Sequence, residues 1–451
     1  MTENKTEHNS VVKTRDLPRK LALDVLLRFE KAGLEKLKAD SLLQQAFGPH
    51  PQLIDQERGF CRALVMGTLR RWLVYDAWIT QLTGRPLKNV VPMVRCLLRL
   101  GLLQLEGGVQ VPDYAAIDSV VQLAKGLKQS PNTIRFLNGV LRSAQRRLAD
   151  QGFECPPLAS DLPGHCQARF GWPSSFTESL SAVYTAGQIE AMAQAAQHPA
   201  VLSIRVNTLR TSVEAYQQAL TAGQIVFEAL PDLPEGFLLP EFSGSPRQLP
   251  GYDEGWFYVQ DAASMWVSRL LNPQPGQQVL DLCAAPGSKT THMAALMDNQ
   301  GAIVAVEPKE ARIHLLNENL QRLGVTCVTV QQGDGLQLDL ADSPRFDAVL
   351  VDAPCSGSGT LRRHPEQLLQ WKRVDLGALN EIQLALLKQG FAALKPGGRL
   401  VYSTCSLLPQ ENVQLVQRFL AETPEAELAQ DSQRLIDKKT DGFYAARFLK
   451  K

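Results

Sequence analysis

From about residue 276 to the C-terminus, short apolar runs alternate with segments of helical periodicity. This alternation predicts a parallel β-sheet with helices on both faces, because neighbouring parallel strands are joined by crossover helices. We expect strands at 279–282, 302–306, 327–330, 348–351 and 399–403, with 443–449 as a final edge strand. In such sheets ligands bind beyond the carboxyl ends of the strands, so the loops there are expected to carry the chemistry.

Residues 15–150 show a different pattern, in which apolar side chains recur at helical spacing, as at Leu21, Val25 and Leu26. Glycine and proline breaks separate one such segment from the next. The stretch also carries most of the positive charge. Residues 1–150 hold 23 Lys and Arg against 14 Asp and Glu, a net +9, whereas the remainder holds 24 against 32, a net −8. This asymmetry indicates either a basic helical domain that binds a polyanion or a solvated helical surface.

The chain is therefore predicted to be multidomain. The expected parts are an all-α domain over 1–155, a linker over 156–174, a small α+β subdomain over 175–260 and an α/β Rossmann-like domain over 261–451. The linker is inferred from clustered prolines and glycines. The subdomain is inferred from a strand-like run at 202–206 followed by a helical one at 213–222.

Several classes of protein are not expected. No window approaches 18 uncharged apolar residues, and the polar N-terminus, Met1–Lys20, lacks the apolar core of a signal peptide. Eight cysteines occur without a C-x-x-C pair or zinc-ligand spacing. We expect a cytoplasmic monomer with neither a membrane span, a disulfide framework nor a metal.

The loop after the first expected strand reads D-L-C-A-A-P-G-S-K-T over 281–290. It has only one glycine, so it is not a nicotinamide fingerprint, and Ser288 separates Gly287 from Lys289, so it is not a P-loop. A turn of small residues remains, with free backbone amides at the start of a helix. Such amides bind a carboxylate, and the methionine carboxylate of S-adenosylmethionine qualifies. The turn residues expected to bind this cofactor are Cys283, Ala284, Ala285, Pro286, Gly287, Ser288 and Lys289.

Acidic residues end the next three strands. Glu307 is placed to accept hydrogen bonds from ribose hydroxyls, Asp334 to meet the adenine amine, and Asp352 to line the same site. Three acids at successive strand ends combined with the turn indicate a nucleotide-like cofactor.

Two cysteines follow two neighbouring strands: Cys355 in D-A-P-C and Cys405 in S-T-C-S. A thiolate is a strong nucleophile. Added to carbon 6 of a cytosine, it makes carbon 5 reactive enough to take a methyl group from a sulfonium. A carboxylic acid near ring nitrogen 3 stabilises that addition, and Asp352 is placed for it. The alternative is two unrelated buried cysteines.

The motifs D-L-C-A-A-P-G-S-K-T, V-D-A-P-C-S-G-S-G (351–359) and Y-S-T-C-S (402–406) resemble the RNA 5-methylcytosine methyltransferases of the RsmB/Nop2/Sun family. The runs at 256–264, 361–366 and 441–448 fit it too, and the helical part resembles the NusB-like RNA-binding domain of one subfamily. The resemblance implies that Cys405 is the nucleophile and that Cys355 assists product release. It implies that the turn, Glu307, Asp334 and Asp352 bind S-adenosylmethionine, and that the substrate is 16S ribosomal RNA.

The sequence departs from the family pattern at three places. Ser288 replaces a second glycine, Glu307 replaces an aspartate, and the route from Glu366 to Trp371 is about two residues longer. The roles of Arg362, Arg363 and Trp371 therefore stay open between RNA contact and a structural insert. Two alternative functions also remain: methylation of another RNA, and an RNA-binding assembly factor with vestigial activity.

Overall fold

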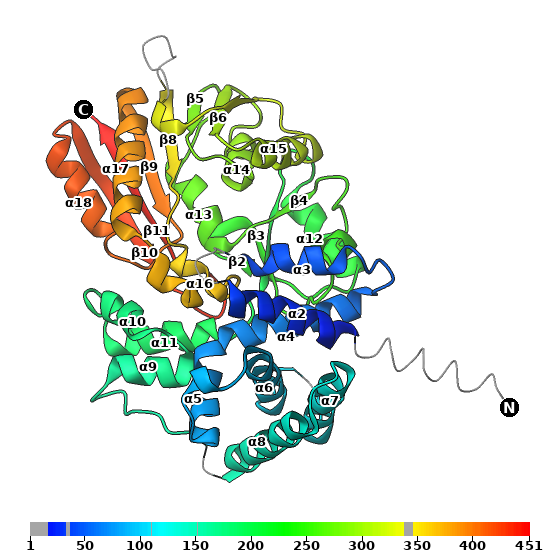
Figure 1. Cartoon of the computed structure of the whole chain (residues 1–451). Helices are drawn as coiled ribbons and strands as arrows, with labels where there is room; N and C mark the ends of the chain where they lie inside the picture. The colour runs from blue at the N-terminus through cyan, green and yellow to red at the C-terminus, as the bar shows by residue number, and fades with distance from the viewer. Residues whose placement is uncertain (1–16, 33–36, 110, 151, 338–345) are drawn as a thin grey trace. The chain divides into compact units, whose positions relative to one another are not determined.

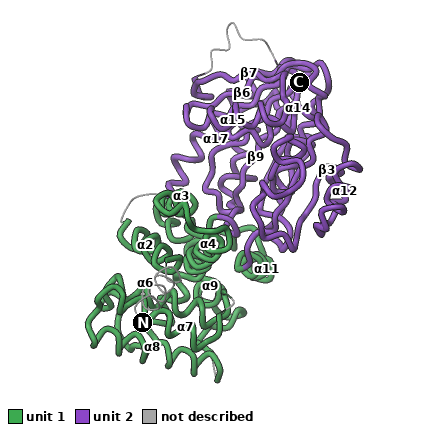
Figure 2. The backbone as a smooth tube through the Cα atoms, turned by 90° about the vertical axis from the view of Figure 1, so that its right-hand side faces the viewer, with its two compact units in different colours: residues 1–197, 364–373 green, residues 198–363, 374–451 purple. Residues whose placement is uncertain are grey.

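The computed structural model describes residues 17–32, 37–109, 111–150, 152–337 and 346–451, so residues 1–16 of the polar N-terminus lie outside it. The chain forms two compact units, coloured separately in Figure 2. Unit 1 comprises residues 1–197 together with 364–373, and unit 2 comprises 198–363 and 374–451. The short segment 364–373 thus leaves the C-terminal domain and packs with the N-terminal helices.

Unit 1 is built of helices, as the sequence predicts. The apolar positions of its first described helix, including Leu21, Val25 and Leu26, are buried in one hydrophobic core. Proline at the first position opens helix α6, where no backbone N–H is needed. The helices are α2 (Leu17–Lys31), α3 (Ala39–Phe47), α4 (Asp55–Arg70), α5 (Trp72–Thr83), α6 (Pro92–Leu105), α7 (Asp113–Gly126), α8 (Pro131–Asp150), α9 (Leu162–Phe170), α10 (Ser174–Ser181), α11 (Ala186–Ala196) and α16 (Glu366–Leu369), with 3₁₀ turns η1 (Leu87–Asn89) and η5 (Trp371–Arg373).

The predicted linker over 156–174 contains helix α9. Asp161 caps its N-terminus by accepting a hydrogen bond from the Gly164 amide at 2.8 Å, and Gly171 ends it in the left-handed conformation. The prolines and glycines that indicated a linker are therefore helix boundary signals. Helices α10 and α11, which the sequence assigned to the α+β subdomain, belong to unit 1.

Unit 2 begins with an antiparallel sheet in the order β2-β3-β1-β4, which is the predicted α+β subdomain. Helix α12 packs on it around Tyr216, Phe237 and Phe257, all fully buried. Its elements are β1 (Leu202–Val206), α12 (Val213–Ala222), β2 (Glu228–Leu230), β3 (Leu233–Leu239), η2 (Pro246–Gln248) and β4 (Phe257–Val259).

A seven-stranded sheet in the order β10-β11-β9-β8-β5-β6-β7 forms the rest of unit 2 (Figure 1). The five strands from β9 to β7 are parallel, and β11 and β10 are antiparallel additions. The elements are α13 (Ala262–Leu271), β5 (Gln278–Asp281), α14 (Ser288–Leu296), β6 (Ala302–Glu307), α15 (Glu310–Leu323), β7 (Val328–Gln332), η3 (Gly335–Gln337), β8 (Phe346–Asp352), η4 (Ser358–Thr360), α17 (Leu376–Ala393), β9 (Leu394–Thr404), α18 (Val413–Glu422), β10 (Ala426–Arg434) and β11 (Phe443–Lys450).

The prediction that 443–449 is an edge strand is wrong. This strand, β11, lies between β9 and β10, and β10 is the edge. The sequence of β10 is polar and mostly exposed, so it lacks the apolar alternation that marks a strand. Pairing with β11 decides its conformation.

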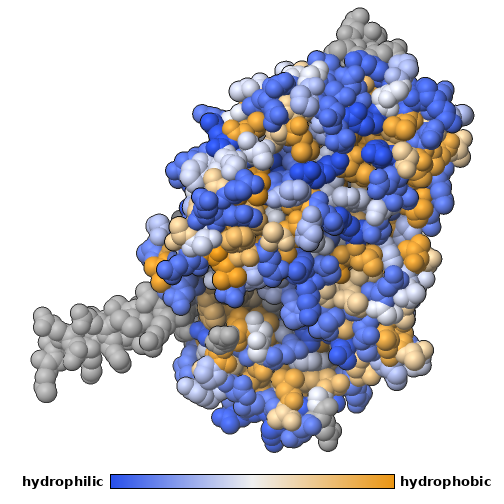
Figure 3. All heavy atoms as spheres, turned by 180° about the vertical axis from the view of Figure 1, so that it is seen from behind, coloured by the Kyte–Doolittle hydropathy of each residue, from blue (hydrophilic) through white to orange (hydrophobic). Residues whose placement is uncertain are grey.

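Both faces of the parallel sheet are covered, as predicted. Val279 packs with α13 and α14 on one face, and Leu280 packs with α17 and α18 on the other. None of the helices in the described part of the chain is long and apolar enough to cross a membrane. On the face seen in Figure 3, hydrophilic residues predominate and smaller hydrophobic groups lie between them.

Candidate active site

Two cysteine loops meet beyond the carboxyl ends of strands β8 and β9. Cys355 follows β8 and Cys405 follows β9 directly. Their Sγ atoms lie 3.3 Å apart, and both side chains are half-buried. The hydrogen bond with Cys405, together with burial, holds the pKa of the Cys355 thiol well above its ordinary value. The fold thus brings together two thiols that are 50 residues apart in sequence.

Asp352 ends strand β8, three residues before Cys355, and its carboxylate is held from two sides. Its Oδ1 accepts a hydrogen bond from Ser403 Oγ at 2.7 Å, across the register pair of β8 and β9. Its Oδ2 pairs with Lys289 Nζ at 2.7 Å. Lys289 is itself buried and lies over the ring of Phe443. The ion pair therefore connects the loop after β5 with the end of β8.

The loop after β5 forms the predicted turn. Its backbone is fixed by a hydrogen bond from the Ala284 amide to the Val306 carbonyl on the next strand, at 3.1 Å. Gly287 adopts a φ of 100°, in the region that favours glycine, and helix α14 begins at Ser288. Ser288 does not need a positive φ. The serine that replaces the family's second glycine is therefore accommodated as an ordinary helical residue.

Glu307 and Asp334 lie at the ends of β6 and β7, but in different surroundings. Glu307 is 1% exposed, and its carboxylate accepts from the Lys309 amide at 3.1 Å and pairs with Arg312 at 3.0 Å. Asp334 is exposed and accepts a hydrogen bond from the Leu336 amide. Glu307 is thus oriented by its neighbours, whereas Asp334 caps a turn at the surface.

Asp281, at the end of β5, was not among the predicted site residues. Its Oδ2 accepts a hydrogen bond from Thr290 Oγ1 at 2.7 Å, while its Oδ1 is buried with no partner among the described residues. Burial raises the pKa of Asp281 to about 7, with a further contribution from the nearby Asp352 charge. A buried oxygen without a partner is costly, so Asp281 is a candidate acceptor for a donor group of a ligand.

Helix α14 is held by a buried polar network from the small sheet. Arg205 on β1 donates to Thr291 Oγ1 at 3.0 Å, and Glu235 on β3 accepts from His292 Nε2 at 2.8 Å. Burial, reinforced by the Arg205 charge, lowers the pKa of His292 to about 4, so the imidazole is neutral near pH 7. The small subdomain therefore positions the helix that begins at the predicted cofactor turn.

A buried carboxylate, Glu411, joins the two cysteine loops and was also missed by sequence reasoning. It accepts hydrogen bonds from the amide and hydroxyl of Ser356, at 2.8 and 2.6 Å, and from the Ser406 hydroxyl. Gln383 on α17 donates to it at 2.9 Å. The two serines are the residues that directly follow Cys355 and Cys405. Glu411 is fully buried, yet a glutamate six residues after a cysteine has no pattern that predicts burial.

The backbone of Gly359 ties the same loops together. Its amide donates to the Cys405 carbonyl at 2.9 Å, and its carbonyl accepts from the Gly442 amide at 2.8 Å. A Cβ at this position would lie 2.0 Å from the Gly442 oxygen and 2.9 Å from the Cys405 oxygen. Because both are backbone atoms, only glycine allows this approach.

The two arginines whose roles were left open both make structural contacts. Arg362 is 2% exposed and donates to backbone carbonyls in the loop 437–440. Arg363 pairs with Asp261 at 2.9 Å and with Asp441 at 2.7 Å. These contacts fix the loops around Gly359 and leave little of either side chain for RNA phosphate.

Trp371 is structural as well. It is 9% exposed and packs edge-on against Phe176 within unit 1. Trp371 lies in the segment 364–373, which contains the stretch that is longer here than in the family pattern. In the part of the chain that the structure describes, no group of three or more His, Cys, Asp or Glu side chains is arranged to hold a metal ion.

Comparison with known proteins identifies the family. A family profile described as 16S rRNA methyltransferase RsmB/F matches residues 268–449. Profiles of the NusB family and of the RsmF/B-like ferredoxin-like domain match 16–146 and 172–243. A probable ribosomal RNA small subunit methyltransferase B from Synechocystis is 38% identical over 394 residues, which cover 84% of each chain. The chain belongs to the ribosomal RNA small subunit methyltransferase B family.

Other relatives agree with this membership. Ribosomal RNA small subunit methyltransferase B from Klebsiella pneumoniae is 34% identical over 88% of this chain and 91% of its own. A methyltransferase homologue from Pyrococcus horikoshii, solved by crystallography, aligns with a TM-score of 0.57 and 32% identity, covering 63% of this chain and 98% of that one. The predicted family, its three-part fold and its S-adenosylmethionine cofactor are therefore confirmed.

The residues present fit this cofactor. The turn Cys283–Lys289 presents the first amides of α14, which have no helical partner and attract a carboxylate. The unpartnered Asp281 Oδ1 and the buried Glu307 supply acceptors for donor groups of the ligand. When bound, S-adenosylmethionine supplies an electrophilic methyl group. Burial raises the pKa of the Cys283 thiol, so this third cysteine is a neutral wall of the site.

Proposed function

We propose that this methyltransferase modifies carbon 5 of a specific cytosine in 16S ribosomal RNA, through a covalent adduct between Cys405 and carbon 6. The observation that carries the proposal is the pair of thiols, 3.3 Å apart, that follow the adjacent strands β8 and β9. A methyltransferase that acts on oxygen or exocyclic nitrogen needs no thiol there. Two thiols in contact suit a reaction that adds a sulfur nucleophile and then removes it.

The chemistry begins when the Cys405 thiol loses its proton to solvent. The thiolate adds to carbon 6, a carbon–sulfur bond forms, and the electron pair of the 5,6 double bond becomes available at carbon 5. Asp352, held by Lys289 and Ser403, is proposed to act as a carboxylic acid whose proton is donated in a hydrogen bond to ring nitrogen 3, where it stabilises the negative charge that develops during the addition. The electron pair at carbon 5 then bonds to the methyl group, and the electron pair of the broken methyl–sulfur bond stays on the cofactor sulfur, which becomes a neutral thioether.

Release requires a proton to leave carbon 5 for solvent while the bond between carbon 6 and sulfur breaks. The electron pair of that bond returns to Cys405 as a thiolate. Cys355 is proposed to help here, because its raised pKa keeps its proton on sulfur near neutral pH. From 3.3 Å it donates a hydrogen bond to the departing thiolate.

RNA is proposed to reach the site with help from the helical unit. Five cations on or next to helices α7 and α8 are exposed: Lys125, Lys128, Arg135, Arg142 and Arg146. Their phosphate contacts would add affinity that falls steeply with salt, through counterion release.

The test is an adduct assay with S-adenosylmethionine and either 16S RNA or small ribosomal subunits as substrate. Cys405→Ala is expected to abolish methylation and to leave no adduct. Cys355→Ala is expected to accumulate an RNA-linked protein that survives denaturing electrophoresis. Cys327→Ala, at a cysteine directly before β7 and therefore at the amino end of a parallel strand, whereas the two thiols lie beyond the carboxyl ends, is the matched control and is expected to behave as wild type. An adduct on Cys405→Ala and none on Cys355→Ala would reverse the two roles.

A further inference from the structure

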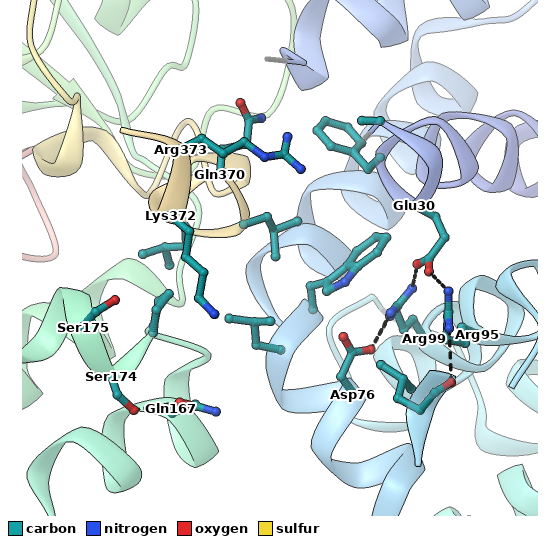
Figure 4. A pocket seen from close by; sticks show the side chains of 18 of the residues that line it. Glu30, Asp76, Arg95, Arg99, Gln167, Ser174, Ser175, Gln370, Lys372 and Arg373 are labelled. Carbon is teal, nitrogen blue, oxygen red and sulfur yellow. Dashed lines mark hydrogen bonds and ion pairs between the residues drawn. The ribbon is translucent and has the colours of Figure 1, made fainter. Parts of the chain in front are cut away.

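A pocket of about 920 Å³ lies within unit 1. Its walls come from α2, α5, η1, α6 and the start of α10, and residues 368–373 close one side (Figure 4). The volume is in the range of ordinary ligand sites, and the lining mixes apolar and charged side chains. Nothing in the catalytic chemistry at Cys405 uses this pocket.

One wall carries a buried ion-pair network whose charges cancel. Arg99, 1% exposed, pairs with Glu30 and Asp76 and lies over the Trp72 ring at 3.7 Å. Arg95 pairs with the same Glu30. Two arginines and two acids give no net charge, so this network fixes the wall and attracts nothing by itself.

The exposed charges of the pocket do not cancel. Lys88 and Lys372 line it at exposed positions, against a single exposed acid, Glu178. In the described part of the chain neither lysine takes part in an ion pair. Figure 4 shows Lys372 on the opposite side of the pocket from the Glu30 and Arg99 network, with its amino group reaching inward. The exposed side chains that line the pocket therefore carry a surplus of one positive charge, from the two lysines over Glu178.

Apolar side chains lie between these cations. Phe29, Leu73 and Leu369 line the pocket and are only partly buried. Cations beside accessible apolar and aromatic surface match a single-stranded nucleic acid, whose phosphates need positive charge and whose unstacked bases need a face to pack on. A duplex presents phosphates but keeps its bases stacked inside.

The segment that closes the pocket connects it to the catalytic loops. Residues 364–373 begin nine positions after Cys355 in the chain but belong to unit 1. They are anchored there by a hydrogen bond from Gln370 Nε2 to the Leu37 carbonyl at 2.8 Å, and by one from the Ala39 amide to Glu366 at 3.3 Å. The cation Lys372 is therefore presented by a fixed segment that continues directly from the loop of Cys355.

We propose that this pocket binds a single-stranded stretch of the RNA substrate, with Lys88 and Lys372 on its phosphates. The inference rests on the proposed function, because it takes RNA as the substrate. It adds a site of recognition distinct from the cytosine pocket, built jointly by the NusB-like helices and by an extension of the catalytic domain.

The experiment uses the full-length protein, since cutting the helices away would also expose the packing partners of 364–373. Binding of 16S RNA to the double variant Lys88→Gln, Lys372→Gln is measured at several salt concentrations. Two lost phosphate contacts are expected to reduce the slope of log affinity against log salt by about 1.4 for single-stranded RNA. The matched control is Lys20→Gln, Lys38→Gln, which removes the same charge from exposed positions of unit 1 that neither line the pocket nor belong to the five cations proposed above for RNA contact.

The expected result is weaker RNA binding by the pocket variant than by its control, with unchanged cofactor affinity and a kcat for methylation that recovers at saturating RNA. Equal losses in the two double variants would overturn the proposal, since charge anywhere on unit 1 would then suffice. Weaker binding to ribosomal particles with unchanged binding to free RNA would also overturn it, in favour of a protein partner. The binding readout does not depend on methylation, so it remains decisive even if the proposed cytosine chemistry fails.

Discussion

Replacing Glu411 tests whether the two cysteine loops must be held together for catalysis. The carboxylate accepts four hydrogen bonds, from Ser356, Ser406 and Gln383. Glu411→Ala removes all four acceptor contacts and leaves buried donors without partners, at a cost on the order of 3 kcal/mol in the free energy of unfolding. Glu411→Gln keeps one oxygen, and the serine hydroxyls can turn to accept from its amide, so a smaller loss of about 1 kcal/mol is expected.

Catalysis should respond more strongly than stability. A displacement of reacting groups by about 1 Å costs roughly 100-fold in rate. Without Glu411, Ser356 loses its link through the carboxylate to Gln383 on α17, and the loop of Cys355 keeps the hydrogen bond from Gln383 Nε2 to the Pro354 carbonyl. We expect kcat to fall roughly 10- to 100-fold in Glu411→Ala, less in Glu411→Gln, with the Michaelis constant for S-adenosylmethionine nearly unchanged. The assay is methyl transfer from labelled cofactor, at a temperature where thermal denaturation shows each variant folded.

The control is Glu422→Gln, the same substitution at an exposed glutamate of α18 that pairs with Lys388 and Arg418. It should leave kcat unchanged. A folded Glu411→Ala enzyme with wild-type kcat would refute the reasoning, because the 3.3 Å contact between the thiols would then not depend on the carboxylate.

Three further outcomes are expected. Glu307→Ala should weaken S-adenosylmethionine binding about 10- to 100-fold, because it removes charge-assisted hydrogen bonds that contribute roughly 1.5–3 kcal/mol. If calorimetry shows an unchanged affinity for S-adenosylmethionine, Glu307 does not bind the ribose. Gly359→Ala should lower kcat or prevent folding, because the added methyl would lie 2.0 Å from the Gly442 carbonyl oxygen. Gly377→Ala is the control and should do neither, because a Cβ at position 377 would make only an ordinary van der Waals contact. The pKa of His292 is about 4 in the folded protein, so the imidazole stays neutral there while it becomes protonated in the unfolded chain below about pH 6.5. The free energy of unfolding should therefore decrease as the pH falls, by about 2 kcal/mol between pH 7 and pH 5. Thermal denaturation of His292→Gln should lack this part of the pH dependence, and an identical slope would contradict the assignment.

Much of the fold was predictable because the residues that form it are locally patterned. The strand that ends at Asp281 and the helix that begins at Ser288 lie where apolar runs and a small-residue turn placed them. Strand β10 was missed because its polar sequence carries no alternation, and helix α9 because its boundary signals, Asp161 and Gly171, match those of a linker. Such boundaries depend on whether the intervening residues find a core to pack against.

The sequence by itself determined the family, the cofactor turn and the two cysteine motifs, since each is a contiguous run of residues with its own chemistry. Only the tertiary structure decided what lies between those runs. It placed Glu411 beneath both cysteine loops, left Asp281 Oδ1 without a partner, and turned Arg363 toward two aspartates instead of RNA. The physical reason is that burial, charge pairing and close backbone approach are properties of surroundings assembled from distant segments, and no single segment of the chain encodes them.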